Sequence, residues 1–133
     1  AQALGAPAVE PGRDRRSGDE NLGAGHLTAG DFDWFEDCYL GSDVHDANPY
    51  AFPMAAASHA DLPPATVVTA GFDPLRDEGL AYAETLSDAG VAATGRNYDD
   101  VAHGFVGLLV KPRLDRAHEA LSDVAGDLRA AFE

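Results

Sequence analysis

An uninterrupted apolar run lies near the centre of this 133-residue chain. Residues 65–70, Ala-Thr-Val-Val-Thr-Ala, follow two prolines and are rich in β-branched side chains, with no alternation of apolar and polar positions. A short run of this kind is typical of a strand that is buried on both faces of a parallel sheet. Residues 74–90 then carry apolar side chains at helical spacing, with Pro74 in the first turn and Gly90 after the last. The pattern predicts a buried strand followed directly by a helix.

The neighbouring segments extend this pattern in both directions. Residues 91–98 predict a second, less apolar strand near the edge of the sheet, and Asp99 and Asp100 predict a turn into the loop that carries His103. Residues 114–132 predict a final helix. Thr28 and Asp31 have the spacing of a capping box, which predicts a helix that runs from there to about Leu40. The order of strand, helix, strand and helix predicts an α/β fold with parallel strands.

The first 26 residues are expected to differ from the rest of the chain. Residues 1–9 are small and apolar and predict a weak strand, and residues 10–26 are polar and glycine-rich and predict a mobile surface loop. Residues 41–64 predict an irregular connection. We therefore divide the chain into residues 1–26, a weak strand plus a mobile polar loop, and residues 27–133, one α/β unit.

The charge of the chain is strongly negative. Asp and Glu number 23 against 9 Lys and Arg, which gives a formal net charge of −14, and the only lysine is Lys111. Such a surface repels nucleic acid and anionic membranes, so neither is expected as a partner. The composition fits a well-hydrated surface, but we favour adaptation to high salt and an origin in a halophile, because salt screens the repulsion between acidic groups.

The compartment is predicted from what the sequence lacks. Cys38 is the only cysteine, so the chain forms no internal disulfide, and this agrees with a reducing cytoplasm. No cationic start precedes an apolar run, and no apolar stretch is long enough to span a bilayer. We expect a cytoplasmic protein. The chain begins at Ala1 and its one methionine is Met54, so we expect it to be processed or incomplete.

Asp73 and His103 are the candidate functional residues. They are thirty positions apart, about the length of one strand–helix–strand crossover, and each follows a predicted strand. Taken singly, Asp73 reads as a helix N-cap and His103 as a loop histidine without a role. Together they are expected to meet at the carboxyl edge of the sheet, where α/β proteins place their sites. The five histidines have no metal-ligand spacing, so no metal and no cofactor are expected: His26, His45, His59, His103 and His118.

Two motifs carry a resemblance to a known family. Residues 63–79, Pro-Pro-Ala-Thr-Val-Val-Thr-Ala-Gly-Phe-Asp-Pro-Leu-Arg-Asp-Glu-Gly, and residues 102–105, Ala-His-Gly-Phe, resemble the C-terminal part of the hormone-sensitive-lipase-like esterases of the α/β-hydrolase fold. The resemblance covers about residues 20–132. It implies the C-terminal portion of an α/β-hydrolase sheet, with Asp73 as the acid and His103 as the general base of a Ser-His-Asp triad. It also implies a small-molecule acyl ester as the substrate.

The chain departs from this family at the nucleophile. The family's Gly-x-Ser-x-Gly elbow and His-Gly-Gly oxyanion loop lie N-terminal to the matched region, and neither motif occurs here. None of the five serines has a glycine-flanked strand–turn–helix setting: Ser17, Ser42, Ser58, Ser87 and Ser122. We expect the chain to supply acid and base only and to be inactive alone. The alternatives are an inactive remnant or interaction module, and one half of a split hydrolase completed by another chain. Homo-oligomerisation is a further possibility, because an incomplete sheet associates readily.

Overall fold

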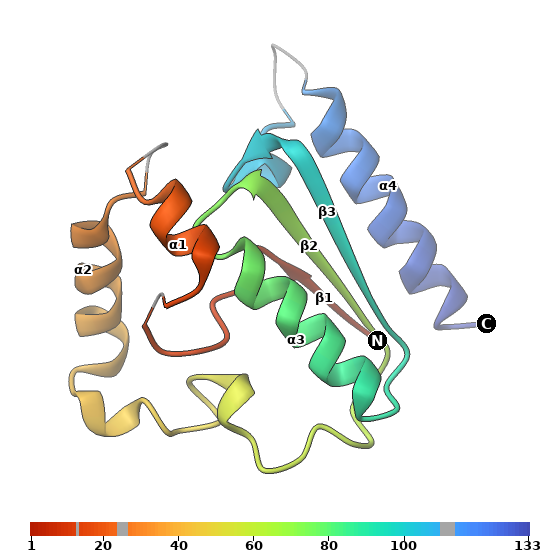
Figure 1. The fold of residues 1–133 in the computed structure, drawn as a ribbon. Coiled ribbons are helices and arrows are strands. Elements are labelled where there is room, and N and C mark those ends of the chain that lie inside the picture. The colour runs from red at the N-terminus through yellow and green to blue at the C-terminus, as the bar shows by residue number, and fades with distance from the viewer. Residues whose placement is uncertain (13, 24–26, 110–113) are drawn as a thin grey trace.

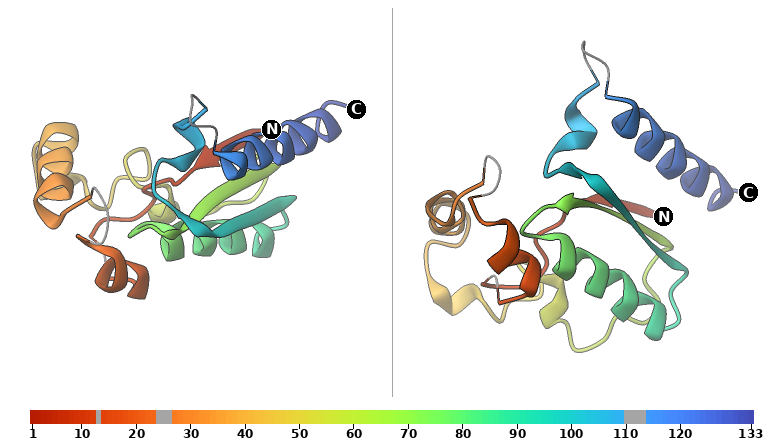
Figure 2. Two further views of the ribbon diagram at one scale, coloured as in Figure 1. Left: turned by 90° about the horizontal axis from the view of Figure 1, so that it is seen from above. Right: turned by 45° about the horizontal axis from the view of Figure 1, so that its top comes forward.

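The computed structural model describes residues 1–12, 14–23, 27–109 and 114–133. His26 and Lys111 lie outside this part of the chain. A sheet of three parallel strands, in the order β1-β2-β3, has α3 on one face and α4 on the other (Figures 1 and 2). The predicted α/β fold with parallel pairing is confirmed. The strands are β1 (Gln2–Gly5), β2 (Ala65–Phe72) and β3 (Ala93–Ala102), and the helices are α1 (Arg16–Asn21), α2 (Ala29–Leu40), α3 (Arg76–Asp88) and α4 (Asp115–Ala130).

Strand β2 is the centre of the fold and is buried on both faces, as its apolar run predicts. Val68 and Ala70 face a cluster that contains Ala117 and Ala120 of α4. On the opposite face, Val67 and Thr69 lie under Gly79 of α3, and Ala65 clusters with Tyr82 and Leu86 of the same helix. Residues 65–70 are all buried, so the core lies on both sides of this one strand.

Helix α3 approaches the sheet closely because Gly79 has no side chain. A Cβ atom at Gly79 would lie 2.8 Å from Cγ2 of Thr69, well inside van der Waals contact. Tyr82 and Leu86 follow on the same buried face of the helix, with 4% and 0% of their surface exposed. This contact fixes the N-terminal end of α3 directly beneath the carboxyl end of β2. The acid-bearing turn between the two elements is therefore short and constrained.

Strand β3 is longer than the sequence predicts. It continues through Asp99 and Asp100, which were expected to form a turn, and ends at Ala102. Both carboxylates are exposed, and Asp100 accepts a hydrogen bond of 2.9 Å from Nε of Arg116 on α4. An edge strand tolerates this because its side chains can point into solvent while the backbone still pairs with β2. The pairing includes an irregularity between Ala70 and Phe72, at the carboxyl end of β2.

Helix α1 lies within the range that was predicted to be a loop. It has only six residues and no apolar periodicity, yet Ser17, Gly18 and Asn21 are buried. So short a helix is not stable by itself, and contacts with α3 therefore supply its stability. The division of the chain at residue 26 stays a prediction. In the part of the chain that the structure describes, no helix is long and apolar enough to cross a membrane.

Candidate active site

The structure brings Asp73 and His103 into contact. Asp73 follows β2 and His103 follows β3, and Nδ1 of His103 lies 2.9 Å from Oδ2 of Asp73. The backbone N–H of His103 also donates to the carbonyl of Phe72 at 3.2 Å, so the two chain segments are joined beside the side-chain contact. The pair lies at the carboxyl edge of the sheet, where parallel strands place their functional loops.

Asp73 is fully buried, and both of its carboxylate oxygens have partners. Oδ2 contacts His103, and Oδ1 accepts a hydrogen bond of 2.8 Å from the backbone N–H of Leu75. Asp73 is therefore not the N-cap of α3, a position that Leu75 occupies without a side-chain bond. It forms a two-residue Asx turn instead, which fixes the carboxylate plane and points Oδ2 at the imidazole. A buried carboxylate requires such partners, because an unpaired one costs several kcal/mol.

His103 is held by the residues that follow it. Gly104 has a φ of 78°, a left-handed conformation that glycine adopts without strain, and it turns the chain into a short 3₁₀ helix (Phe105–Gly107). Phe105 is buried, with its ring 5.4 Å from that of Tyr98. The backbone on both sides of His103 is thus anchored, while 26% of the imidazole surface stays exposed.

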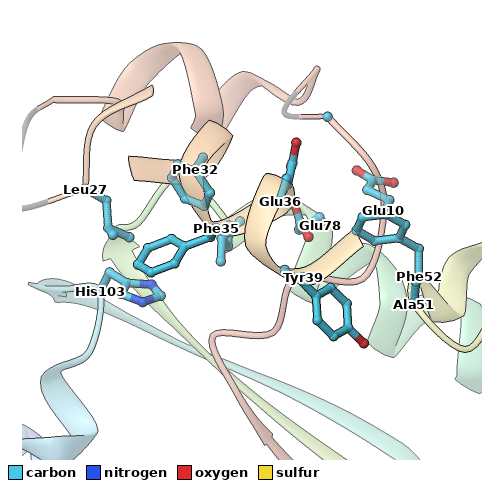
Figure 3. A pocket seen from close by; sticks show the side chains of 13 residues that line it. Glu10, Leu27, Phe32, Phe35, Glu36, Tyr39, Ala51, Phe52, Glu78 and His103 are labelled. Atoms are coloured by element: carbon cyan, nitrogen blue, oxygen red, sulfur yellow. The ribbon is translucent and has the colours of Figure 1, made fainter. Parts of the chain in front are cut away.

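An apolar pocket of about 260 Å³ adjoins the exposed side of His103 (Figure 3). Its lining combines the loop after β1, helix α2, the segment near Phe52 and the start of α3. In Figure 3, His103 lies at one end of the pocket, with Phe52 and Glu10 toward the other. The apolar side chains of the lining are Leu27, Phe32, Phe35, Tyr39, Phe52 and Leu75. Phe105, Val106, Leu108 and Leu109, which follow His103 in the sequence, are not among its lining residues.

Glu78 is the second buried carboxyl near the site and, unlike Asp73, it lines this pocket. Only 2% of its surface is exposed, and Oε1 accepts a hydrogen bond of 2.7 Å from the backbone N–H of Val9. Burial raises the pKa of the Glu78 carboxyl to about 7, and the nearby Glu10 carboxylate adds to the increase. The bond from Val9 acts in the opposite direction but is the smaller effect. Glu78 thus joins α3 to the chain after β1 and changes charge near neutral pH.

We expect Glu78 to make the free energy of unfolding fall as pH rises. Its pKa is near 7 in the folded chain against an ordinary 4.5, so the folded state holds its proton more tightly. The resulting stabilisation is present below pH 4.5 and is lost as pH passes 7, a change of about 2 to 3 kcal/mol. Urea unfolding of wild-type protein and Glu78→Gln at pH 5 and pH 8 measures this difference. Glu84→Gln removes one exposed carboxyl from the same helix and is expected to keep the full decline; an equal decline in Glu78→Gln would refute the assignment.

The five serines all lie in the described part of the chain. The hydroxyl of Ser17 is buried and donates to the carbonyl of Pro74 at 2.8 Å. Ser42 and Ser58 accept from nearby backbone N–H groups, and Ser122 donates to the carbonyl of His118 within α4. Ser87 is exposed near the end of α3. Each serine thus belongs to a helix, a turn or a loop, and none follows a strand in the setting of a nucleophile elbow.

Sequence reasoning did not find two parts of the site. Residues of α2, including Phe32 and Phe35, line the pocket although α2 is distant from Asp73 in sequence. Helix α1 contacts the acid-bearing turn through Ser17, which was considered only as a possible nucleophile. The one local signal was Ser17 followed three residues later by Glu20, a spacing typical of a helix start.

Comparison with known proteins identifies the family. A family model described as alpha/beta hydrolase fold matches residues 1–107, and the chain belongs to this family. Carboxylic ester hydrolase LipN of Mycobacterium tuberculosis is 48% identical over 83 residues, which cover 62% of this chain and 22% of LipN. A hyperthermophilic esterase from Pyrobaculum calidifontis has a TM-score of 0.89 and 39% identity over 97% of this chain and 42% of that one. EstE1, a thermostable carboxylesterase from a metagenomic library, has a TM-score of 0.91 and 32% identity over 99% of this chain and 45% of EstE1.

These relatives are longer than this chain. The matched segments make up less than half of both solved esterases and less than a quarter of LipN. The expected α/β-hydrolase membership is confirmed, and the relatives named here are hydrolases of carboxylic esters or esterases. The roles of Asp73 and His103 stay predictions.

Proposed function

We propose that this chain is the acid-and-base part of a carboxylic ester hydrolase that acts through a Ser-His-Asp triad. The observation that carries the proposal is the contact of 2.9 Å between Nδ1 of His103 and Oδ2 of the fully buried Asp73. A carboxylate on Nδ1 keeps the proton on that nitrogen, so Nε2 carries the lone pair that can accept another proton. This is the tautomer that a general base requires.

In the proposed reaction, His103 transfers two protons, one in each half of the reaction. Its Nε2 takes the proton of the serine hydroxyl as the oxygen attacks the acyl carbon, and gives it to the departing alcohol. It then takes a proton from the water that attacks the acyl-enzyme, and gives this proton to the serine. Asp73 stays ionised throughout and stabilises the imidazolium that forms in each half of the reaction.

The pocket beside His103 supports a substrate with a small or medium apolar group. A volume of about 260 Å³ accommodates a short acyl or alkyl chain, and the aromatic side chains of Phe32 and Phe35 offer no hydrogen-bond partners. The ester carbonyl would lie at the His103 end of the pocket and the apolar group against α2.

The nucleophile and the oxyanion donors are proposed to come from residues other than these 133. No Gly-x-Ser-x-Gly sequence occurs in the chain, and this favours either a longer protein or a second chain as their source. The isolated chain is then inactive. Loss of an oxyanion donor alone lowers kcat by about a hundred- to a thousand-fold, and loss of the nucleophile removes the acyl-enzyme route.

The experiment that tests this function is a chimera. Residues 1–133 replace the matching part of the Pyrobaculum calidifontis esterase, with which they share 39% identity. The chimera is expected to hydrolyse a p-nitrophenyl acyl ester, and the isolated chain is not. Circular dichroism and gel filtration establish that the chimera is folded. A folded chimera without activity would contradict the proposal and favour an inactive remnant or an interaction module.

We also propose that the protein works in the cytoplasm, because its single cysteine fits a reducing compartment, and at high salt, because its net charge is −14. Repulsion between closely spaced carboxylates falls as salt shortens the Debye length, from about 10 Å at 0.1 M to about 3 Å at 1 M. The thermal midpoint of unfolding is expected to rise steeply as the KCl concentration is raised from dilute buffer to about 2 M. An unchanged midpoint would overturn the salt adaptation.

A further inference from the structure

Helix α1 contacts the acid-bearing turn through one polar face. Ser17, Glu20 and Asn21 are three and four positions apart, so they lie on the same side of the helix. Each of them bonds to a residue between Gly71 and Asp77, the segment that contains Asp73. Ser17 and Asn21 are 0% and 7% exposed, whereas Glu20 is exposed. Two polar side chains that are buried against one turn point to a role in that turn.

Ser17 and Asp77 stabilise the first turns of each other's helices. The backbone N–H of Ser17 donates to Oδ2 of Asp77 at 2.9 Å, and the backbone N–H of Asp77 donates to Oγ of Ser17 at 3.1 Å. Both N–H groups belong to helix N-termini, where no intrahelical acceptor exists. Burial alone would raise the pKa of Asp77, but hydrogen bonds from Arg76 and Ser17 outweigh it and lower that pKa. The two helix starts are therefore fixed relative to each other.

Ser17 also bonds to the Pro74–Leu75 peptide group, which lies next to Asp73. Its hydroxyl donates to the carbonyl oxygen of Pro74 at 2.8 Å, and the N–H of Leu75 donates to Oδ1 of Asp73 at 2.8 Å. The Pro74 carbonyl and the Leu75 N–H belong to one planar peptide unit. Rotation of that unit moves both bonds together. The Ser17 hydroxyl thus holds the plane that orients the Asp73 carboxylate.

Two further bonds hold the backbone on either side of this peptide. Nδ2 of Asn21 donates to the carbonyl of Asp73 at 3.4 Å. Arg76 donates to the carbonyl of Gly71 at 3.0 Å and to Oε2 of Glu20 at 3.1 Å, and so connects the end of β2 to α1. The acid-bearing turn is thereby connected to α1 at three points: at Gly71 through Arg76, at the carbonyl of Asp73, and at the carbonyl of Pro74.

We propose that Ser17, supported by Asn21 and Glu20, is a positioning residue for Asp73. It fixes the Pro74–Leu75 peptide, this peptide fixes Oδ1 of Asp73, and Oδ2 is thereby aimed at His103. The inference rests on the proposed function, in which Asp73 orients the imidazole. Ser17 itself touches neither the substrate nor the reacting atoms.

The test is the rate at which the His103 Nδ1 proton exchanges with water, measured by NMR in the full 133-residue chain. Ser17→Ala is expected to raise this rate by about tenfold, because a released peptide lets the Asp73 carboxylate turn away. Asn21→Ala is expected to raise it by about threefold, since its bond is longer. Asp73→Asn gives the reference value for a lost contact. Ser122→Ala also removes a hydroxyl that donates to a backbone carbonyl at 2.8 Å, and is expected to leave the rate unchanged.

A merely structural role gives a different result. Ser17→Ala and Asn21→Ala would then lower the thermal midpoint while the Nδ1 exchange rate stayed at the wild-type value, and this overturns the proposal. If Ser17→Ala does not fold, the Nδ1 exchange rate of Asn21→Ala tests the proposal in its place: an increase supports it and an unchanged rate overturns it. The measurement contains no ester. An inactive chimera therefore rejects the proposed function but does not affect the exchange measurement. An unchanged exchange rate rejects the positioning role of Ser17 but does not affect the proposed function.

Discussion

An Asp73→Asn substitution in the chimera is expected to lower kcat for ester hydrolysis by about ten-thousand-fold. The asparagine still accepts the Leu75 N–H through its oxygen, so the turn keeps its shape. Its amide group, however, presents an N–H to Nδ1 of His103 where the carboxylate presented an acceptor. The proton then moves to Nε2, and the imidazole can no longer act as a base toward serine.

A matched control separates this effect from a general loss of charge. Asp100→Asn removes an exposed carboxylate from β3, whose partner is Arg116 on α4. It is expected to change kcat by less than about twofold, because exposed ion pairs contribute little. Initial rates with a p-nitrophenyl ester measure both variants. If Asp73→Asn kept more than a tenth of the wild-type kcat, Asp73 would not have the proposed role.

A Gly71→Ala substitution is expected to lower the free energy of unfolding by about 3 kcal/mol or more. A Cβ atom at this position would lie 2.1 Å from the carbonyl oxygen of Asp99 and 2.5 Å from its carbon. Both are backbone atoms of the neighbouring strand, so no side-chain rotation relieves the overlap. The carboxyl ends of β2 and β3 must move apart, and these are the ends that carry Asp73 and His103.

The same substitution is expected to weaken the contact between Asp73 and His103. Separation of the strands lengthens the backbone bond from His103 to Phe72, which lies beside the side-chain contact. Urea unfolding measures the loss of stability. Gly107→Ala is the control, since a Cβ atom there meets nothing within 4 Å. A loss below about 1 kcal/mol in Gly71→Ala would show that the strands adapt, against the expectation.

The sequence predicted those elements whose signals are local. The apolar run of β2 and the capping box of Thr28 and Asp31 both appear in the structure where the pattern places them. The spacing of Asp73 and His103 also predicted their contact correctly, because about thirty residues suffice for one strand–helix–strand crossover between neighbouring parallel strands. These features depend on backbone geometry that a few neighbouring residues determine.

The features that the sequence did not predict depend on distant partners. Asp99 and Asp100 read as a turn, yet they stay in β3 because its backbone pairs with β2 and Arg116 lies close to Asp100. Ser17 and Glu20 have the spacing of a helix start, but the Ser17 side chain stabilises α3 rather than its own helix. The residue pattern of one segment does not show which distant segment it will pair with or contact.

The chimera offers the most direct measurement of the central claim, that this chain supplies the acid and base of an ester hydrolase. The account predicts that the folded chimera hydrolyses a p-nitrophenyl acyl ester, and that His103→Ala in the same chimera lowers kcat by at least about a thousand-fold without loss of folding. A folded chimera that is inactive, or whose activity survives His103→Ala, would contradict it.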